Sequence, residues 1–249
     1  MSEEFEPFGG TRQGPGAQPT RREQLVTQWV TIAEVCVALI MGFALTFAAM
    51  LPLFGLLDID FKDNVAVIAF LLPIQALIFS GLAWVLSRDR VPQDVLPAPR
   101  SPLFSIGFGV AVGGLGYVVE TGALWLLEQV DFTSSEQPWV AGVFDDPSSW
   151  WKIFPLIVVV GPVAEELFFR AYAFRHLLTR VGAPVAYLLS SLLFALSHGN
   201  PSGIPAYTIL ALFLAWSYRR SGSLWTPVVA HVVHNAIVVI TYLYLGVDG

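Results

Sequence analysis

Residues 151–174 read WKIFPLIVVVGPVAEELFFRAYAF. This stretch is long and apolar enough to cross a bilayer, which takes about 20 residues of helix. Its second half nevertheless carries Glu165, Glu166 and Arg170. Ionisable side chains are costly at membrane depth, so they usually face a bundle interior or a wet cavity and mark a functional site. The stretch therefore predicts a membrane helix with one polar, cavity-facing side.

The rest of the chain has the composition of a membrane protein. Of its 249 residues 55% are hydrophobic and only 13% charged, about half the charge of a soluble domain. Six more apolar segments are predicted helices: 29–57, 65–86, 103–127, 184–198, 204–218 and 224–245. The fold class is therefore all-α, a polytopic transmembrane helix bundle of about seven spans. We expect a disordered cytoplasmic tail over residues 1–27, helices without motifs over 28–150, and a catalytic helical core over 151–249.

Charges between the segments alternate in sign and predict the topology. Arginines occupy every second connection: Arg21, Arg22, Arg88, Arg90, Arg100, Arg175, Arg180, Arg219 and Arg220. Acids dominate the other connections: Asp58, Asp60, Asp63, Glu128, Asp131, Glu136, Asp145, Asp146 and Asp248. Because Lys and Arg mark cytoplasmic loops, we expect a cytoplasmic N-terminus and an extracytoplasmic C-terminus. The net charge of −6 thus indicates topology, and no nucleic-acid partner is expected.

The fifth and sixth segments are too short for two full spans. Residues 184–218 must supply two helices and a turn, whereas two spans need about 40 residues. We therefore expect a short hairpin whose turn, residues 198–203, lies at membrane depth. Non-helical backbone is tolerated there only inside protein or beside water, which predicts that His198 borders a cavity.

The two adjacent acids of residues 151–174 are expected to have different roles, because neighbouring side chains on a helix point about 100° apart. Glu166 and Arg170 are four residues apart with the acid first, the favoured order for a helical ion pair. That pair offsets the cost of burying Glu166. Glu165 has no such partner on its own helix. It must find one across the bundle, and it suits the work of a general base.

Two further segments add histidines at helical spacing. Phe194 shares a face with His198, and His231 shares a face with Asn235. An imidazole and an amide together can donate hydrogen bonds to a developing oxyanion. No serine or cysteine is convincingly paired with a histidine, so direct attack by water on an amide is the simplest mechanism.

A zinc site remains open as an alternative mechanism, because Glu165, His198 and His231 would form a two-histidine, one-carboxylate set. We expect no metal and no other cofactor. The lone Cys36 excludes an intrachain disulfide and a cysteine metal site.

The three clusters, Glu165-Glu166-x-x-x-Arg170, Phe194-x-x-x-His198 and His231-x-x-x-Asn235, resemble the motifs of one family. It comprises the CAAX proteases and bacteriocin-processing enzymes, also called ABI-family intramembrane glutamic proteases. The resemblance covers about residues 151–245.

The resemblance implies a metal-independent intramembrane endopeptidase acting on a membrane-associated or lipidated protein or peptide. Glu165 would be the base, His198 would position water, and His231 with Asn235 would form the oxyanion hole. Glu166, Arg170 and Phe194 would support them. The resemblance also implies a conical cavity open to the cytoplasm.

Other readings of the same residues remain. The chain could be a non-catalytic scaffold or bacteriocin-immunity protein on the same fold, or a transporter that couples protons to buried acids. Inverted repeats would favour the transporter, and none is found. Outside the motifs, Glu34 and Glu120 lie inside apolar segments, and His234 is expected to support or pack against its neighbours. The glycines at 113, 114 and 116 predict close helix packing.

Overall fold

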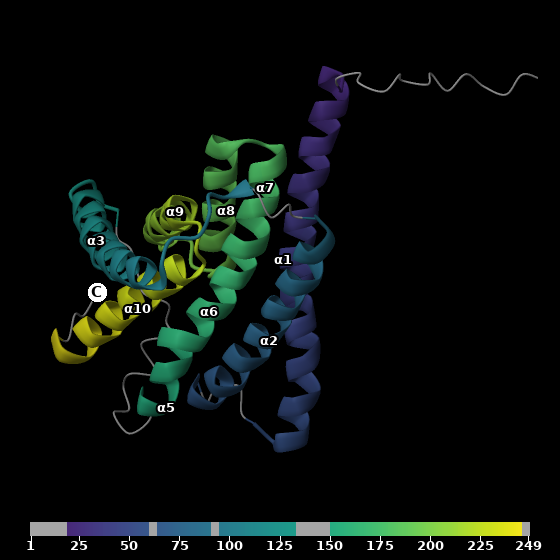
Figure 1. The fold of residues 1–249 in the computed structure, drawn as a ribbon. Coiled ribbons are helices and arrows are strands. Elements are labelled where there is room, and N and C mark those ends of the chain that lie inside the picture. Colours follow the sequence, from purple (N-terminus) through teal and green to yellow (C-terminus); the bar gives the residue numbers. More distant parts are fainter. Residues whose placement is uncertain (1–18, 60–63, 91–94, 133–149, 246–249) are drawn as a thin grey trace, which may run out of the picture.

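The computed structural model describes residues 19–59, 64–90, 95–132 and 150–245 (Figure 1). All seven predicted segments are helical, and the described residues contain no strand. The helices are α1 (Arg21–Leu57), α2 (Asn64–Arg90), α3 (Pro102–Glu128), a composite helix over residues 150–180, α8 (Ala183–Ser197), α9 (Ile204–Ser221) and α10 (Trp225–Leu245). The predicted all-α bundle is thus confirmed. Residues 1–18 of the expected tail, and the acids at 60, 63, 136, 145, 146 and 248, lie outside the described residues.

The first helix begins earlier than the sequence indicated. Residues 21–27 were expected in the disordered tail, but they form the first turns of α1. A capping box explains the difference: the Glu23 backbone N–H donates to the Thr20 hydroxyl (3.3 Å), and the Thr20 backbone N–H donates to the Glu23 carboxylate (2.7 Å). With 37 residues, α1 is about 55 Å long and extends beyond a hydrocarbon layer of about 30 Å.

The composite helix contains two π-helical segments between three α-helical ones. It runs through α5 (Trp150–Pro155), a π-helical turn η2 (Leu156–Val160), α6 (Gly161–Glu166), a second π-helical turn η3 (Leu167–Phe174) and α7 (Arg175–Arg180). Pro155 and Pro162 have no N–H to donate, and a π-turn is one way for a helix to absorb such a residue. The motif Glu165-Glu166-x-x-x-Arg170 therefore lies where one register gives way to another.

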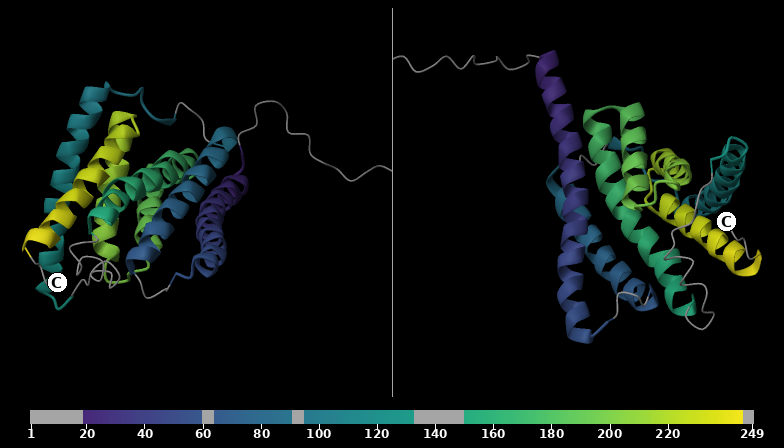
Figure 2. Two further views of the ribbon diagram at one scale, coloured as in Figure 1. Left: turned by 90° about the horizontal axis from the view of Figure 1, so that it is seen from below. Right: turned by 180° about the vertical axis from the view of Figure 1, so that it is seen from behind.

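Helices α3 and α10 lie side by side, teal and yellow in Figure 2. A Cβ atom on Gly113 would collide with the carbonyl oxygen of Ala230 and lie 2.9 Å from Cβ of Val233. Gly109, one turn earlier, meets α10 in the same way. The predicted close packing is confirmed for Gly113, whereas Gly114 faces open space. This contact fixes α10, and with it two motif residues, against α3.

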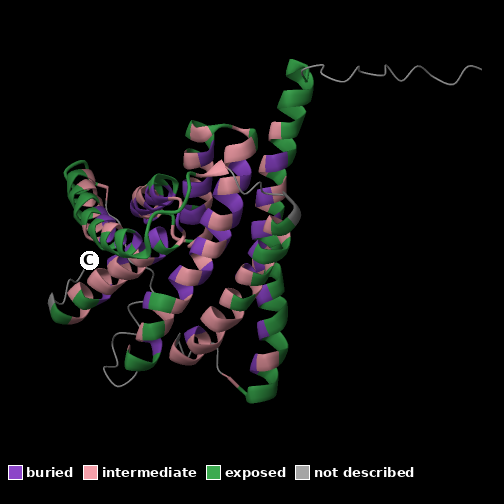
Figure 3. Ribbon diagram, in the orientation of Figure 1, coloured by how far each residue is buried: buried purple, intermediate pink, exposed green. Residues whose placement is uncertain are grey.

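The surface is apolar and several charged groups are inside, the reverse of a soluble protein. Figure 3 shows buried residues gathered on the composite helix, α8 and α9, with exposed residues along α1 and α3. Ile40, Leu77 and Leu103 are at least 68% exposed, whereas Glu166 and Arg170 are buried. Among the described residues four helices, α1, α2, α3 and α10, are long and apolar enough to cross a membrane. The chain is an integral membrane protein.

Candidate active site

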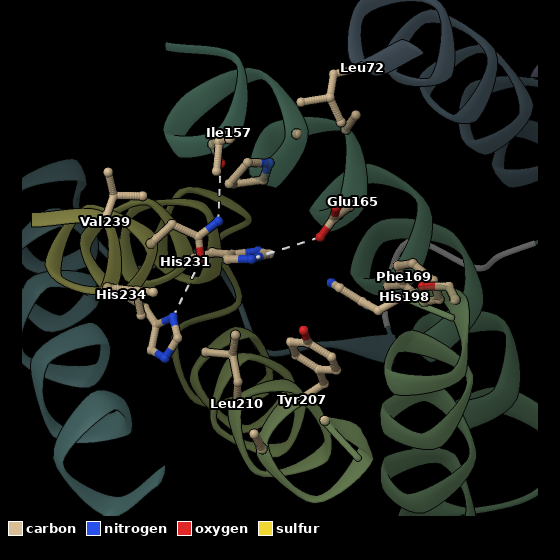
Figure 4. Close-up of a pocket in the computed structure, with 18 of the residues that line it drawn as sticks. Leu72, Ile157, Glu165, Phe169, His198, Tyr207, Leu210, His231, His234 and Val239 are labelled. Atoms are coloured by element: carbon tan, nitrogen blue, oxygen red, sulfur yellow. Dashed lines mark hydrogen bonds and ion pairs between the residues drawn. The ribbon is translucent and has the colours of Figure 1, made fainter. Parts of the chain in front are cut away.

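A cavity of about 530 Å³ lies between the helices of the bundle (Figure 4). Its walls come from α2, the end of α3, residues 157–169, the α8–α9 turn and α10. The four predicted catalytic residues all line it: Glu165, His198, His231 and Asn235. The predicted position of His198 beside a cavity is therefore confirmed. Glu34 lies elsewhere, 2.8 Å from His176 in a contact between α1 and α7.

The two adjacent acids differ in exposure, in line with the angle between them. Glu165 reaches the cavity with 30% of its side chain exposed, whereas Glu166 is completely buried. Arg170 donates from Nη1 to Oε1 of Glu166 at 2.8 Å, which confirms the predicted ion pair. Its Nη2 donates to the Ala211 carbonyl at 3.1 Å, and its guanidinium lies 4.7 Å from the ring centre of Phe194. Glu166 is thus paired with Arg170 away from the cavity, and Glu165 is the one of the two adjacent acids that lines it.

His231 connects the buried pair with the cavity. Its Nδ1 lies 2.9 Å from Oε1 of Glu166, and its Nε2 lies 3.8 Å from Oε2 of Glu165. An ionised carboxylate only accepts hydrogen bonds, so Nδ1 carries the proton toward Glu166. The hydrogen bond to Glu166 therefore sets the ring orientation of His231, with Nε2 toward Glu165.

His198 is held by its own helix and by aromatic rings. Its Nδ1 donates to the Phe194 carbonyl at 2.9 Å, and its ring stacks on Tyr207 with centroids 4.2 Å apart. Figure 4 shows His198, Glu165 and His231 pointing into one space. Nδ1 thus points back along α8, and the ring lines the cavity. Sequence reasoning missed Tyr207, because a single tyrosine in an apolar helix gives no signal.

Asn235 is fixed by a carbonyl that the π-turn leaves without a helical partner. In η2 the Gly161 N–H bonds to the Leu156 carbonyl, five residues back. The next carbonyl in this register, that of Ile157, would need an N–H from Pro162, which has none. Asn235 Nδ2 donates to it instead at 3.1 Å. The proline inside a predicted span was the sequence signal for this contact.

The other side of Asn235 is held by two polar residues. Its Oδ1 lies 3.4 Å from Nδ1 of His234, whose Nε2 lies 2.6 Å from Oε2 of Glu120. Both Glu120 and His234 line the cavity. They thus hold one orientation of the Asn235 amide, with its oxygen toward His234 and its nitrogen toward Ile157 and the cavity.

The described residues contain no group of three or more His, Cys, Asp or Glu arranged to hold a metal ion. Glu165 and His231 approach one another, but the third member of the zinc set considered above does not complete a cluster with them.

The comparisons with known proteins cover the segment that carries this site. Residues 147–237 match the family model described as type II CAAX prenyl endopeptidase Rce1-like. The "Putative membrane peptidase YdiL" of Bacillus subtilis is 33% identical over 93 residues, which is 36% of this chain and 38% of YdiL. The "Membrane-embedded CAAX protease MroQ" of Staphylococcus aureus is 30% identical over 93 residues, 35% of this chain and 38% of MroQ. The match therefore spans about two fifths of these relatives. No solved structure matches the chain.

Proposed function

We propose that this chain, whose residues 147–237 belong to the family of CAAX proteases and bacteriocin-processing enzymes, is an intramembrane endopeptidase that uses Glu165 to activate water. The observation that carries the proposal is that the two adjacent acids differ in burial and in partners. Glu166 is buried against Arg170 and His231, while Glu165 meets the cavity and lies 3.8 Å from His231. A partly exposed carboxylate beside an imidazole suits a general base.

The proposed reaction needs no covalent intermediate. Glu165 takes a proton from a water that His198 helps to orient, and the water oxygen bonds to the carbonyl carbon of the substrate. The carbonyl electrons move onto oxygen, which accepts a hydrogen bond from the Asn235 amide. Collapse of this intermediate breaks the C–N bond, and Glu165 returns its proton to the leaving amine. Preorganised donors of this kind stabilise the oxyanion without rearrangement during the reaction.

His231 completes the proposed site when Nε2 carries a proton. After a small approach across the 3.8 Å gap, Glu165 can share the proton taken from water in a hydrogen bond with Nε2 of His231, and the proton is back on Glu165 when the C–N bond breaks. The oxyanion would then lie between the imidazole and the Asn235 amide, one helical turn apart on α10. All of these steps run without a metal, on side chains the structure brings together.

We further propose a membrane-associated or lipidated protein or peptide as substrate. The cavity combines a polar catalytic side with apolar side chains of α2, including Ile68, Leu72 and Phe79. We propose an orientation with the N-terminus in the cytoplasm and the C-terminus outside, on the strength of the arginine-bearing connections.

The test compares protein termini in membranes of cells that carry wild type, Glu165→Gln or Glu34→Gln. Glutamine keeps the shape of Glu165 but cannot accept the proton, so products made by wild type should be absent. Glu34→Gln is the matched control, because it changes an acid inside a membrane helix that does not line the cavity. Cleavage that persists in a well-expressed Glu165→Gln protein would overturn the assignment. Identical termini in all three would favour the scaffold or immunity role.

A further inference from the structure

We propose that the active-site cavity opens toward the extracytoplasmic face, so that the substrate is a peptide segment presented outside the cytoplasm. The inference rests on the proposed protease site, and it names the side from which that site is reached. It differs from the cytoplasmic opening that the family resemblance implied. Three observations carry it: which ends of the helices line the cavity, where the arginines gather, and which lining residues are exposed.

The cavity lies toward one end of the bundle. It is lined by residues near the start of α2, such as Ile68, and by Glu128, the last residue of α3. Tyr242, near the end of α10, also lines it. Two clusters join the ends of α2 and α10 to α5: Ile68 packs with Ile153, and Tyr242 lies in a cluster with Trp150. Residues from four helices therefore place the cavity at the end where α2 and α5 begin and α3 and α10 finish.

The lining residues are less exposed away from that end. Phe169 and Leu210 are 2% and 4% exposed. Glu128, at the end of α3, is exposed. The catalytic carboxylate of Glu165 lies between these limits in exposure. A peptide would therefore enter past the end of α3 and reach the catalytic groups further inside.

The arginines occupy the opposite end. Arg88 lies in the last turn of α2, Arg180 ends α7 and Arg220 is next to last in α9. The start of α3 also lies at this end, because the backbone N–H of Arg100 donates to the Ser221 carbonyl at the end of α9 at 2.9 Å. Among the residues that the structure describes, no arginine or lysine lines the cavity.

Lysine and arginine gather at the cytoplasmic ends of membrane helices. At the cavity end, Lys152 is the one lysine or arginine among the residues that the structure describes. The charge pattern therefore assigns the cytoplasm to the end away from the mouth. The sequence alone does not show which halves of the helices line the cavity.

The experiment is cysteine labelling of the full chain in intact cells. Cys36 is the single native cysteine, so Cys36→Ala gives a background without thiols. Single cysteines are then placed at the rim (Glu128→Cys), inside the cavity (Leu72→Cys) and at the opposite end (Arg220→Cys). A small membrane-impermeant thiol reagent is applied before and after permeabilisation, and labelling in detergent after denaturation measures the total.

We expect Glu128→Cys and Leu72→Cys to react in intact cells, and Arg220→Cys to react only after permeabilisation. Reaction of Arg220→Cys in intact cells, or of the other two only after permeabilisation, would overturn the proposal. It would equally fail if Leu72→Cys stayed unlabelled from outside while Glu128→Cys reacted, since the cavity would then be closed at that face. The labelling does not depend on catalysis, so an active Glu165→Gln protein would refute the proposed function and leave this result intact.

Discussion

Replacement of Arg170 by alanine should destabilise the protein strongly, although Arg170 does not line the cavity. The guanidinium donates to Glu166 at 2.8 Å and to the Ala211 carbonyl at 3.1 Å, and it lies over the ring of Phe194. Its side chain is 2% exposed and that of Glu166 is not exposed at all. The substitution therefore removes both bonds, leaves a void and leaves a carboxylate buried without its cation.

Breaking a buried ion pair from one side costs about 3–5 kcal/mol, most of it for the charge left behind. At about 2–4 °C per kcal/mol for a chain of this size, the unfolding midpoint should fall by about 10 °C. The assay is thermal unfolding of the purified protein in detergent, followed by tryptophan fluorescence. Arg170→Ala should also lose activity, because His231 takes its orientation from the same Glu166 oxygen.

Arg88→Ala provides the control. Arg88 also lies 4.7 Å from an aromatic ring centre, that of Trp84, but it is exposed. An exposed cation–π contact contributes about 0.5–1 kcal/mol, so this variant should unfold close to the wild-type temperature. Adding Glu166→Gln to Arg170→Ala should recover part of the loss, because it removes the stranded charge. The reasoning is refuted if Arg170→Ala unfolds no earlier than Arg88→Ala, or if the second substitution recovers nothing.

Three further predictions concern the packing of α3 on α10, the orientation of the Asn235 amide and the need for a metal. Gly113→Ala should destabilise by about 1–3 kcal/mol in the same unfolding assay because its methyl would collide with the backbone of α10, whereas Gly114→Ala, which faces open space, should not. Glu120→Gln should lower kcat about 10-fold at unchanged KM, less than the 10²-fold or more for a lost oxyanion donor, since it loosens the residue that holds the Asn235 amide. Its effect should disappear in an Asn235→Ala background, and an additive loss would contradict a positioning role. Chelators should leave peptide cleavage unchanged, and a loss that zinc restores would instead support a metal site.

The features of the site that lie within a single helix could be predicted from the sequence. The Glu166–Arg170 pair depends only on a four-residue spacing, and the different exposure of Glu165 depends only on the angle between neighbours. Contacts between helices could not be predicted in this way. The bond of His231 to Glu166 joins residues 65 positions apart, and nothing in either segment specifies which nitrogen faces which oxygen.

The positions of the helices could be predicted from the sequence, but some of their details could not. Apolar composition indicated the seven helical segments, and length distinguished the long spans from the short hairpin of residues 184–218. The start of α1 was missed because the polar residues 21–27 look like tail, although Thr20 and Glu23 carry the spacing of a capping box. The π-turns were missed because hydrophobic periodicity over a uniformly apolar segment does not report the helical register.

Those π-turns make the aim of the catalytic side chains depend on the number of residues as well as on their identity. Each residue turns an α-helix by about 100°. Deleting one residue from Leu156–Val160 would let this wide turn tighten to a regular α-helix and would shift Ile157 along and around the helix axis relative to Glu165, by less than about 100° because the π-helical turn already holds an extra residue. The carbonyl that holds Asn235 and the carboxylate that faces the cavity could then no longer point to the same place. A one-residue deletion here should be as damaging as losing Glu165 itself, even with every motif residue still present.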